Sequence, residues 1–520
     1  MVKKKLIGVV SSIVLSSFLI FTGCTNNGKI QSVAGSNEFK GKNPKYVFLF
    51  IGDGMGMTQI NSAEIYLGNK KDSKVPNVQK LNFTQFPVEG INTTYASDSF
   101  IPDSASAGTA IATGNKTSDG VISMDPSKKE KYKSMAEIAK ENGMKVGIVS
   151  SVSLDHATPA VFYAHQPSRN NYYDIEIELG KSNFDYFAGG GFKQPTGSDK
   201  NKPDAFEEAK KNGYKVVNTK DDFEKLDSKD GKVIAISPKL DSEKAIPFSI
   251  NNDKEVISLA DFTKKGIEVL DNNKGFFMMV EGGKVDWACH ANDAASSINE
   301  VIGFDNSIVE AMKFYEKHPD ETLIVVTADH ETGGFSIGFA GTGYETFFNK
   351  LSNQKISYDE FTKKIDEYRK SHTQENAKIE DLLPLIKENY GLEAIDSSVR
   401  ADLETKVKAG DEDAAEKLGM VLNDNDISSL KEALKQSMID PKARTKDEQS
   451  KLLYGGYDPV TVTLTHILNS KAGIAFTSYA HTGVPVGVYA KGVGQEMFGG
   501  YFDDTDLNKK LLSIMGISKK

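Results

Sequence analysis

Short apolar runs, rich in β-branched and aromatic residues, recur along this chain of 520 residues, and polar residues directly adjoin each run. Continuous runs of this kind are typical of strands that are buried on both faces of a parallel sheet. The run at 484–490 alternates apolar residues with glycine and is expected to be the last strand of the chain. The expected strands lie at residues 46–51, 146–151, 185–191, 275–280, 322–328 and 484–490.

The pattern changes between residues 341 and 457, where Lys, Glu and Asp dominate and apolar residues recur at helical spacing. Helices are expected at residues 358–368, 378–389 and 427–438, and no strand is expected in this segment. We interpret residues 341–457 as a helical cap insertion over a cleft. The whole pattern predicts an α/β fold, with a large central, mostly parallel β-sheet flanked by helices and interrupted by this insertion.

The first 23 residues have the pattern of a lipoprotein signal peptide. Three lysines precede an apolar segment of 16 residues, which is shorter than the roughly 20 residues that span a bilayer. The small Thr22 and Gly23 precede Cys24, as in a lipobox, so Cys24 is expected to become the lipidated N-terminus. Residues 24–43 would then form a polar tether, and the protein would lie in the cell envelope, outside the cytoplasm.

Charge and cysteine content narrow the class of protein. The net charge of −9 becomes −12 without the leader, because three lysines and no acidic residue are lost. This balance argues against nucleic-acid binding and against binding to anionic lipid headgroups. Only Cys24 and Cys289 are present, so a lipid on Cys24 excludes an intramolecular disulfide. Stability must therefore come from the core, for which 39% hydrophobic residues are sufficient.

The segment 281–290 is the strongest candidate for a metal site, because it contains Glu281, Asp286 and His290. Glu281 directly follows an expected strand. If a helix begins nearby, Asp286 and His290 are separated by four residues and share one face of it. By itself, such a cluster is also typical of a solvated helix start.

Other expected strands carry potential ligands at their ends. In open α/β sheets the site lies outside the carboxyl ends of the strands, so these segments can meet in one cleft. For Asp53, which lies between two glycines, the alternative is a simple Asp-Gly turn. The residues concerned are Asp53, Thr158, Asp329, His330 and His481.

Two further residues are suited to phosphate chemistry. Ser104 begins a run of small residues that ends at Gly114, so it is expected at a helix start, where free N–H groups favour an anion. The guanidinium of Arg169 can bind a phosphate through two hydrogen bonds. The alternatives are that Ser104 only caps the helix and that Arg169 is only solvated.

Together these motifs resemble the alkaline phosphatase family, and they occur in the order of that family. The resemblance covers residues 46 to about 340 and continues from about 472 to the end. It implies a catalytic domain of this family over residues 44–520, and commonly a homodimer, whose interface the insertion would extend or block. The motifs are Asp53-Gly-Met-Gly, Asp103-Ser104-Ala-Ser, His156-Ala-Thr158-Pro, Ser168-Arg169, Gly189-Gly-Gly, the 281–290 segment, Thr-Ala-Asp329-His330 and His481-Thr-Gly.

The resemblance also implies two zinc ions and a third ion, usually magnesium. One zinc would be held by Asp286, His290 and His481, the second by Asp53, Asp329 and His330, and the third ion by Asp53, Thr158 and Glu281. Mixed nitrogen and oxygen ligands suit zinc, and a set of oxygens suits magnesium. Ser104 would be the nucleophile that forms a phosphoserine intermediate, and Arg169 would bind the phosphate of small phosphomonoesters at alkaline pH.

The residues at two positions leave the identity of the third ion undecided. Some relatives carry an Asp and a Lys where this chain has His156 and Trp287. A nitrogen ligand from His156 would shift the preference towards zinc or cobalt; alternatively, His156 binds a magnesium-bound water and Trp287 only packs. Alternative functions are a phosphodiesterase or sulfatase of the same superfamily, or a non-catalytic lipoprotein that binds zinc or phosphate.

Several other polar residues are expected to lie outside the site. The segment Asn423-Asp-Asn-Asp426 lacks the glycine and the terminal glutamate of a calcium loop, so Asp426 is expected to be a helix N-cap. The remaining histidines are expected to be ordinary surface or core residues. They are His165, His318, His372 and His466.

Overall fold

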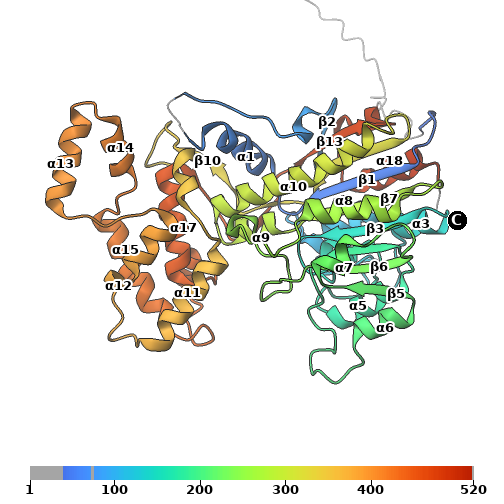
Figure 1. Cartoon of the computed structure of the whole chain (residues 1–520), viewed down its shortest axis with the longest axis horizontal. Helices are drawn as coiled ribbons and strands as arrows, with labels where there is room; N and C mark the ends of the chain where they lie inside the picture. Colours follow the sequence, from blue (N-terminus) through green and yellow to red (C-terminus); the bar gives the residue numbers. More distant parts are fainter. Residues whose placement is uncertain (1–38, 72–74, 518–520) are drawn as a thin grey trace, which may run out of the picture. The chain divides into compact units, whose positions relative to one another are not determined.

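The computed structural model describes residues 39–71 and 75–517, so the expected signal peptide, Cys24 and most of the tether lie outside the described residues. A ten-stranded sheet has the order β14-β2-β13-β8-β1-β7-β3-β4-β6-β5 (Figure 1), and β13 is antiparallel to both of its neighbours while the other pairs are parallel. The strands are β1 (Tyr46–Gly52), β2 (Val88–Thr93), β3 (Lys145–Ser150), β4 (Tyr186–Gly189), β5 (Tyr214–Val217), β6 (Lys232–Ile236), β7 (Phe276–Gly282), β8 (Thr322–Ala328), β13 (Val486–Gly492) and β14 (Gly500–Asp503).

Helices cover the sheet, and two short antiparallel strand pairs form separate two-stranded sheets. None of the helices in the described part of the chain is both long and apolar enough to cross a membrane. The strand pairs are β9 (Glu331–Thr332) with β12 (His481–Thr482), and β10 (Ser336–Ile337) with β11 (Ile474–Ala475). The helices outside the insertion are α1 (Met57–Asn69), α2 (Ser104–Thr113), α3 (Met135–Glu141), α4 (Ala157–Ala160), α5 (Tyr172–Lys181), α6 (Ala205–Lys211), α7 (Lys220–Glu224), α8 (Leu259–Leu270), α9 (Lys284–His290), α10 (Ala294–Tyr315), α17 (Pro459–Ala472) and α18 (Thr505–Met515).

The central strand β1 explains why its sequence is apolar throughout, since both of its faces are buried. Phe50 points to the face covered by α8 and α10, where its ring lies 5.9 Å from that of Phe304. Leu49 points to the opposite face and packs in the cluster that contains Ile111 of α2 and Leu511 of α18. A strand buried on one face only would alternate apolar and polar residues. Each such buried side chain contributes about 1.5–3 kcal/mol to stability.

The expected strands are confirmed to within a few residues, with one correction. The expectation that residues 484–490 form the last strand is wrong, because β14 follows and pairs in parallel with β2. β14 has only four residues and lies at the edge of the sheet, with Tyr501 exposed. Such a short edge strand has no continuous apolar run, and its pairing depends on the tertiary structure.

Residues 341–457 are helical, with no strand in this fully described segment. The elements are η3 (Phe348–Asn353), α11 (Tyr358–Ser371), α12 (Ile379–Tyr390), α13 (Ser397–Lys408), α14 (Glu412–Gly419), α15 (Asp424–Ser437) and α16 (Glu448–Tyr454). Of these elements, η3, α11, α15 and α16 contact α17, whereas α13 and α14 pack against each other at one side (Figure 1). Apolar side chains of the insertion join the same buried cluster as the α8 and α10 face of the sheet. Asp426 is not the N-cap of α15: Asn423 is, and Asp426 completes its capping box by accepting from the Asn423 N–H.

Candidate active site

Neighbouring parallel strands end together at one edge of the sheet and bring distant segments side by side. Asp53 and Asp329 directly follow β1 and β8, whose last residues are paired in register. Glu281, near the end of β7, is paired with Ile51 near the end of β1. The carboxyl ends of parallel strands thus collect three carboxylates in one place, which agrees with the general position of sites in such sheets.

The first group of potential ligands contains two imidazoles and a carboxylate. Nε2 of His290 lies 3.3 Å from Asp286 Oδ1 and 3.2 Å from Nε2 of His481, which lies 3.5 Å from the same carboxylate oxygen. The other nitrogens contact backbone carbonyls, His290 Nδ1 at 2.5 Å from Tyr479 O and His481 Nδ1 at 2.7 Å from Pro102 O. Because a carbonyl only accepts, each Nδ1 carries a proton, so Nε2 is the nitrogen that each ring presents to Asp286. A bound cation would replace a proton on Nε2 and lie between the imidazoles and the carboxylate.

A second group surrounds His330. Its Nε2 lies 3.4 Å from Asp53 Oδ1, 3.5 Å from Asp329 Oδ2 and 3.2 Å from the hydroxyl of Ser104. Its Nδ1 lies 3.3 Å from the hydroxyl of Thr332. The ligand atoms of Asp53, Asp329 and His330 all lie within 4.8 Å of one another, so a single ion can contact all three. Such a mixed donor set fits zinc.

A third group consists of Asp53, Glu281 and His156, whose ligand atoms also lie within 4.8 Å of one another. Each has one buried polar atom with no hydrogen-bond partner among the described residues, namely Asp53 Oδ1, Glu281 Oε1 and His156 Nδ1. The second oxygen of Glu281 accepts from the Ser150 hydroxyl. The Thr158 hydroxyl lies 3.4 Å from Asp53 Oδ2. Because buried unpaired oxygens are costly, the carboxylates of Asp53 and Glu281 fit a bound cation.

Ser104 and Arg169 meet at the start of α2. Ser104 is its first residue, and the N-cap Asp103 accepts from the N–H of Ser106. The second oxygen of Asp103 accepts from Arg169 Nη1 at 2.9 Å, while Arg169 Nη2 lies 3.2 Å from His156 Nε2. A guanidinium can only donate, so Nε2 of His156 accepts and its proton is on Nδ1. The hydroxyl, the guanidinium and the free N–H groups of the helix start form a site suited to phosphate.

The model of the alkaline phosphatase family matches residues 44–517. The chain belongs to this family. Alkaline phosphatase 3 of Bacillus subtilis (strain 168) is 32% identical to it, over 98% of this chain and 96% of that protein. A cold-active alkaline phosphatase of the psychrophile Shewanella sp. is 26% identical, with a TM-score of 0.70 over 90% of this chain and 99% of that one. The alkaline phosphatase of Thermus thermophilus is similar in fold, with a TM-score of 0.73 and 20% sequence identity, over 93% of this chain and 94% of that one.

Burial perturbs the acidic groups of the site. Burial raises the pKa of Asp329 to about 7, with help from the charge of Asp286, and raises that of Glu281 to about 8. Burial and Asp329 likewise raise the pKa of Asp53 well above its usual range. Burial also opposes ionisation of Asp286, but His290 and then His481 hold its pKa well below the usual range. A cation would displace protons from the first three groups, so binding is coupled to proton release.

A cavity of about 300 Å³ opens onto Ser104, Arg169 and the first ligand group. Sequence analysis did not identify Tyr358 and Tyr457 as part of it, because an isolated tyrosine in a helical segment gives no signal. It also did not assign Asp103 the role of holding Arg169. The lining residues are Ser104, His156, Arg169, Glu243, Asp286, Trp287, His290, Tyr358, Tyr457 and His481.

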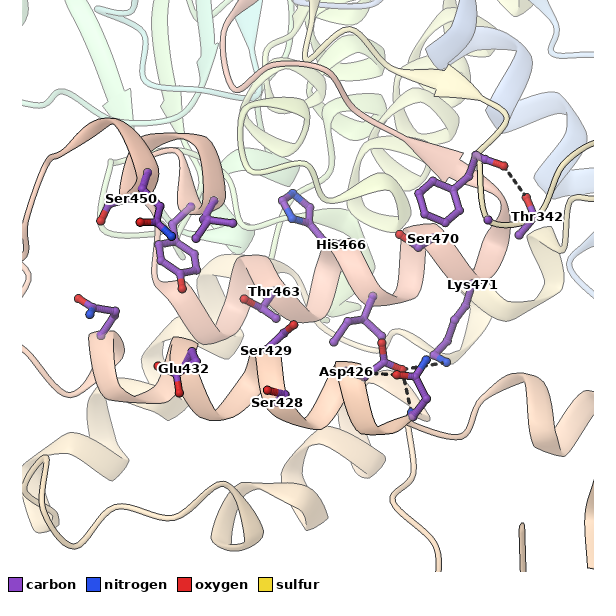
Figure 2. Close-up of a pocket in the computed structure, with 18 of the residues that line it drawn as sticks. Thr342, Asp426, Ser428, Ser429, Glu432, Ser450, Thr463, His466, Ser470 and Lys471 are labelled. Atoms are coloured by element: carbon purple, nitrogen blue, oxygen red, sulfur yellow. Dashed lines mark hydrogen bonds and ion pairs between the residues drawn. The ribbon is translucent and has the colours of Figure 1, made fainter. Parts of the chain in front are cut away.

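A larger cavity, of about 910 Å³, lies elsewhere, between α15, α16 and α17, and none of the candidate ligands lines it. Figure 2 shows polar side chains of α15 and α17 around it, among them Ser428, Glu432 and Thr463. We place the active site in the smaller cavity, because the reactive groups converge there. His466 connects the two regions, since it lines the large cavity and its Nε2 lies 3.1 Å from Asn292 Oδ1, two residues after His290.

Proposed function

We propose that this chain is a metal-dependent phosphomonoesterase that hydrolyses small phosphate monoesters at alkaline pH through a phosphoserine intermediate. The observation that carries the proposal is the position of the Ser104 hydroxyl. It lies at a helix start, 3.2 Å from His330 Nε2, in the same cavity as Arg169. A nucleophile, an anion-binding helix start and a guanidinium are the parts that phosphoryl transfer requires.

In this proposal the Ser104 oxygen attacks phosphorus, and the bond between phosphorus and the ester oxygen breaks. The alcohol leaves with a proton, and the phosphoryl group is on Ser104. Water then attacks phosphorus, the serine oxygen leaves as the hydroxyl, and inorganic phosphate is released. Arg169, held on Asp103, binds the non-bridging oxygens, and the N–H groups at the start of α2 stabilise their charge.

The first two ligand groups would hold zinc: Asp286 with His290 and His481, and Asp53 with Asp329 and His330. When bound, zinc supplies the positive charge that stabilises the serine alkoxide and the leaving oxygen. The imidazoles are oriented for this, since the Nδ1 atoms of His290 and His481 contact carbonyls and leave Nε2 free.

For the third ion we propose an oxygen site of Asp53, Thr158 and Glu281. While Arg169 donates to Nε2 of His156, the proton on Nδ1 prevents that atom from being a ligand. This favours the role of His156 as a donor to a water or an oxygen over its role as a nitrogen ligand. Magnesium, which binds oxygens and keeps several waters, suits such a site.

The alternative functions are less well supported. A complete third ligand set beside a serine nucleophile favours a monoesterase over a phosphodiesterase or sulfatase, and comparing p-nitrophenyl phosphate with its bis-ester distinguishes them. A non-catalytic lipoprotein that binds zinc or phosphate would not need Ser104 next to the ligands. The decisive test is phosphate release at alkaline pH with and without EDTA, followed by re-addition of zinc and magnesium. No phosphate release from the zinc- and magnesium-loaded protein would refute the proposal.

We also propose that residues 1–23 are removed as a lipoprotein signal peptide and that a lipid on Cys24 anchors the protein outside the cytoplasm. Cys24→Ala should then release the protein from membranes at unchanged specific activity, because the tether precedes β1. A mutant that still partitions with membranes would contradict this. We further propose that residues 341–457 form a cap over the cleft. We also propose that the protein is a homodimer, which analytical ultracentrifugation tests.

A further inference from the structure

One part of the active-site cavity is lined by aromatic rings. Trp287 comes from α9, whereas Tyr358 and Tyr457 come from the insertion. Tyr358 packs edge-on against Tyr457, with ring centres 5.5 Å apart, and also against Phe248 at 5.5 Å. Trp287 packs against His156, with ring centres 5.8 Å apart. We call Trp287, Tyr358 and Tyr457 the aromatic wall.

The buried Lys284 contacts Trp287 of the aromatic wall and also Phe248, the ring that packs against Tyr358. Nζ of Lys284 lies 4.8 Å from the ring centre of Trp287 and 3.8 Å from that of Phe248. Its side chain is only 1% exposed, and its charge is paired with Asp241 at 2.5 Å. Cation–π contacts are strongest when the cation is desolvated, as it is here. Lys284 therefore holds Trp287 and Phe248, and through Phe248 also Tyr358, in fixed positions.

Tyr358 is attached through its backbone to the segment that carries His290. Its N–H donates to Asp293 Oδ2 at 3.0 Å, and Asp293 is fully buried three residues after His290. Gln354 Nε2 donates to the same carboxylate. The start of α11 is therefore fixed relative to the metal ligands, and the ring of Tyr358 is fixed with it.

Tyr457 is attached in a similar way. It follows Gly455, at which an added Cβ would lie 2.3 Å from the ring of Tyr479. The carbonyl of Tyr479 contacts Nδ1 of His290. The Tyr479 hydroxyl donates to the carbonyl of Leu453 in α16. This close contact requires glycine and holds the end of α16 against the loop beside His290. The aromatic wall is thus preorganised.

The two tyrosine hydroxyls are available to a ligand. Neither has a hydrogen-bond partner within residues 39–71 and 75–517. Burial raises the pKa of Tyr358 well above its usual range and also raises that of Tyr457. Both hydroxyls therefore keep their protons at alkaline pH and can donate. The wall offers apolar ring surface with two donors.

We propose that Trp287, Tyr358 and Tyr457 form a leaving-group subsite that selects phosphomonoesters with a planar aromatic leaving group over small aliphatic ones. This inference rests on the proposed phosphomonoesterase function. With phosphate between Ser104 and Arg169, the group on the ester oxygen must occupy the rest of the same cavity. Its volume of about 300 Å³ is at the small end for ligand sites, so it suits one ring system rather than a long chain.

The test compares kcat/KM for phenyl phosphate and glycerol 1-phosphate in the full-length, metal-loaded protein. Contacts between aromatic rings change binding by about 2- to 12-fold. Tyr457→Leu and, independently, Tyr358→Leu should lower kcat/KM for phenyl phosphate about three- to tenfold and change that for glycerol 1-phosphate less than about twofold. Tyr457→Phe keeps the ring and should retain most of the preference. Point variants are preferable to removing the insertion, whose apolar residues belong to the common core.

The matched control is Tyr344→Leu, since Tyr344 belongs to the same insertion but is fully exposed and does not line the cavity. Calorimetric binding of phenylphosphonate and methylphosphonate gives a second readout that needs no turnover. Tighter binding of phenylphosphonate, lost in Tyr457→Leu, supports the subsite. Equal losses for both esters, or an unchanged preference in both leucine variants, overturn it. If the wild-type protein hydrolyses neither ester, the proposed function fails, and the phosphonate comparison alone decides the subsite.

Discussion

His466 donates from Nε2 to Oδ1 of Asn292 over 3.1 Å, which connects α17 to the end of the helix that carries His290. Nδ2 of Asn292 donates to the carbonyls of Cys289 and Ser478, both at 2.9 Å. One side chain thus joins the segment of His290 to the loop that leads to His481. These two histidines are expected to share a zinc, so Asn292 is expected to set their spacing.

Replacing Asn292 should therefore accelerate zinc loss. Asn292 has a left-handed backbone with φ of 51°, which glycine adopts freely and alanine does not. Asn292→Gly removes only the amide, whereas Asn292→Ala adds a backbone cost of about 1–2 kcal/mol. Both variants should release zinc to a chromophoric chelator several times faster than the wild type. Both should lower Tm, because the buried hydrogen bonds of the amide are lost, and the alanine variant should lower it further. Native zinc retention in Asn292→Gly would show that the amide does not position the ligands.

Ser104→Ala should abolish the phosphoenzyme while leaving the fold and the zinc content unchanged. The change removes one hydroxyl from the start of α2, and Asp103 still caps the helix. Turnover should fall by several orders of magnitude, because the covalent route is lost. Radiolabelled phosphate trapped at low pH measures the intermediate, and metal analysis is the control. A labelled Ser104→Ala protein would identify another nucleophile.

Arg169→Ala should raise KM and weaken inhibition by inorganic phosphate more than it lowers kcat. A guanidinium that binds phosphate through two hydrogen bonds contributes to ground-state and transition-state binding alike. Asp103→Asn is the matched variant, since asparagine also caps helices but loses the charge of the 2.9 Å ion pair with Arg169. It should raise KM several-fold, less than Arg169→Ala does. Unchanged phosphate inhibition in both variants would exclude Arg169 from the site.

His156→Asp should increase the affinity for magnesium and the stimulation by it. The substitution replaces an N–H donor with an anionic oxygen beside Asp53 and Glu281, and magnesium prefers oxygen ligands. His156→Asn is the control, because it adds an oxygen without charge and should have a smaller effect. Apo-protein reconstituted with zinc plus magnesium, or with zinc plus cobalt, gives the measurement. No gain in magnesium affinity or stimulation from the aspartate would contradict this expectation.

The sequence by itself determined six of the ten strands of the central sheet, but not β2, β5, β6 and β14. Runs such as 46–51 are apolar throughout because both faces of the strand are buried, and this pattern is local. The spacing of Asp286 and His290 predicted a shared helix face, and α9 confirms it. The short edge strand β14 was not predicted, because its pairing with β2 decides it. The N-cap of α15 was assigned to Asp426 instead of Asn423, because the capping geometry decides it.

Only the tertiary structure decided which groups face each other. Contacts between residues far apart in sequence, such as Arg169 with Asp103 or His466 with Asn292, depend on side-chain direction and leave no periodic signal. The tautomer of His156 follows from its neighbour Arg169, which the sequence could not place at 3.2 Å. Tyr358 and Tyr457 lie 99 residues apart and meet because α11 and α16 both pack around α17. The local pattern of apolar and polar residues determines the helices and strands. The packing of these helices and strands determines which side chains meet in the cavity.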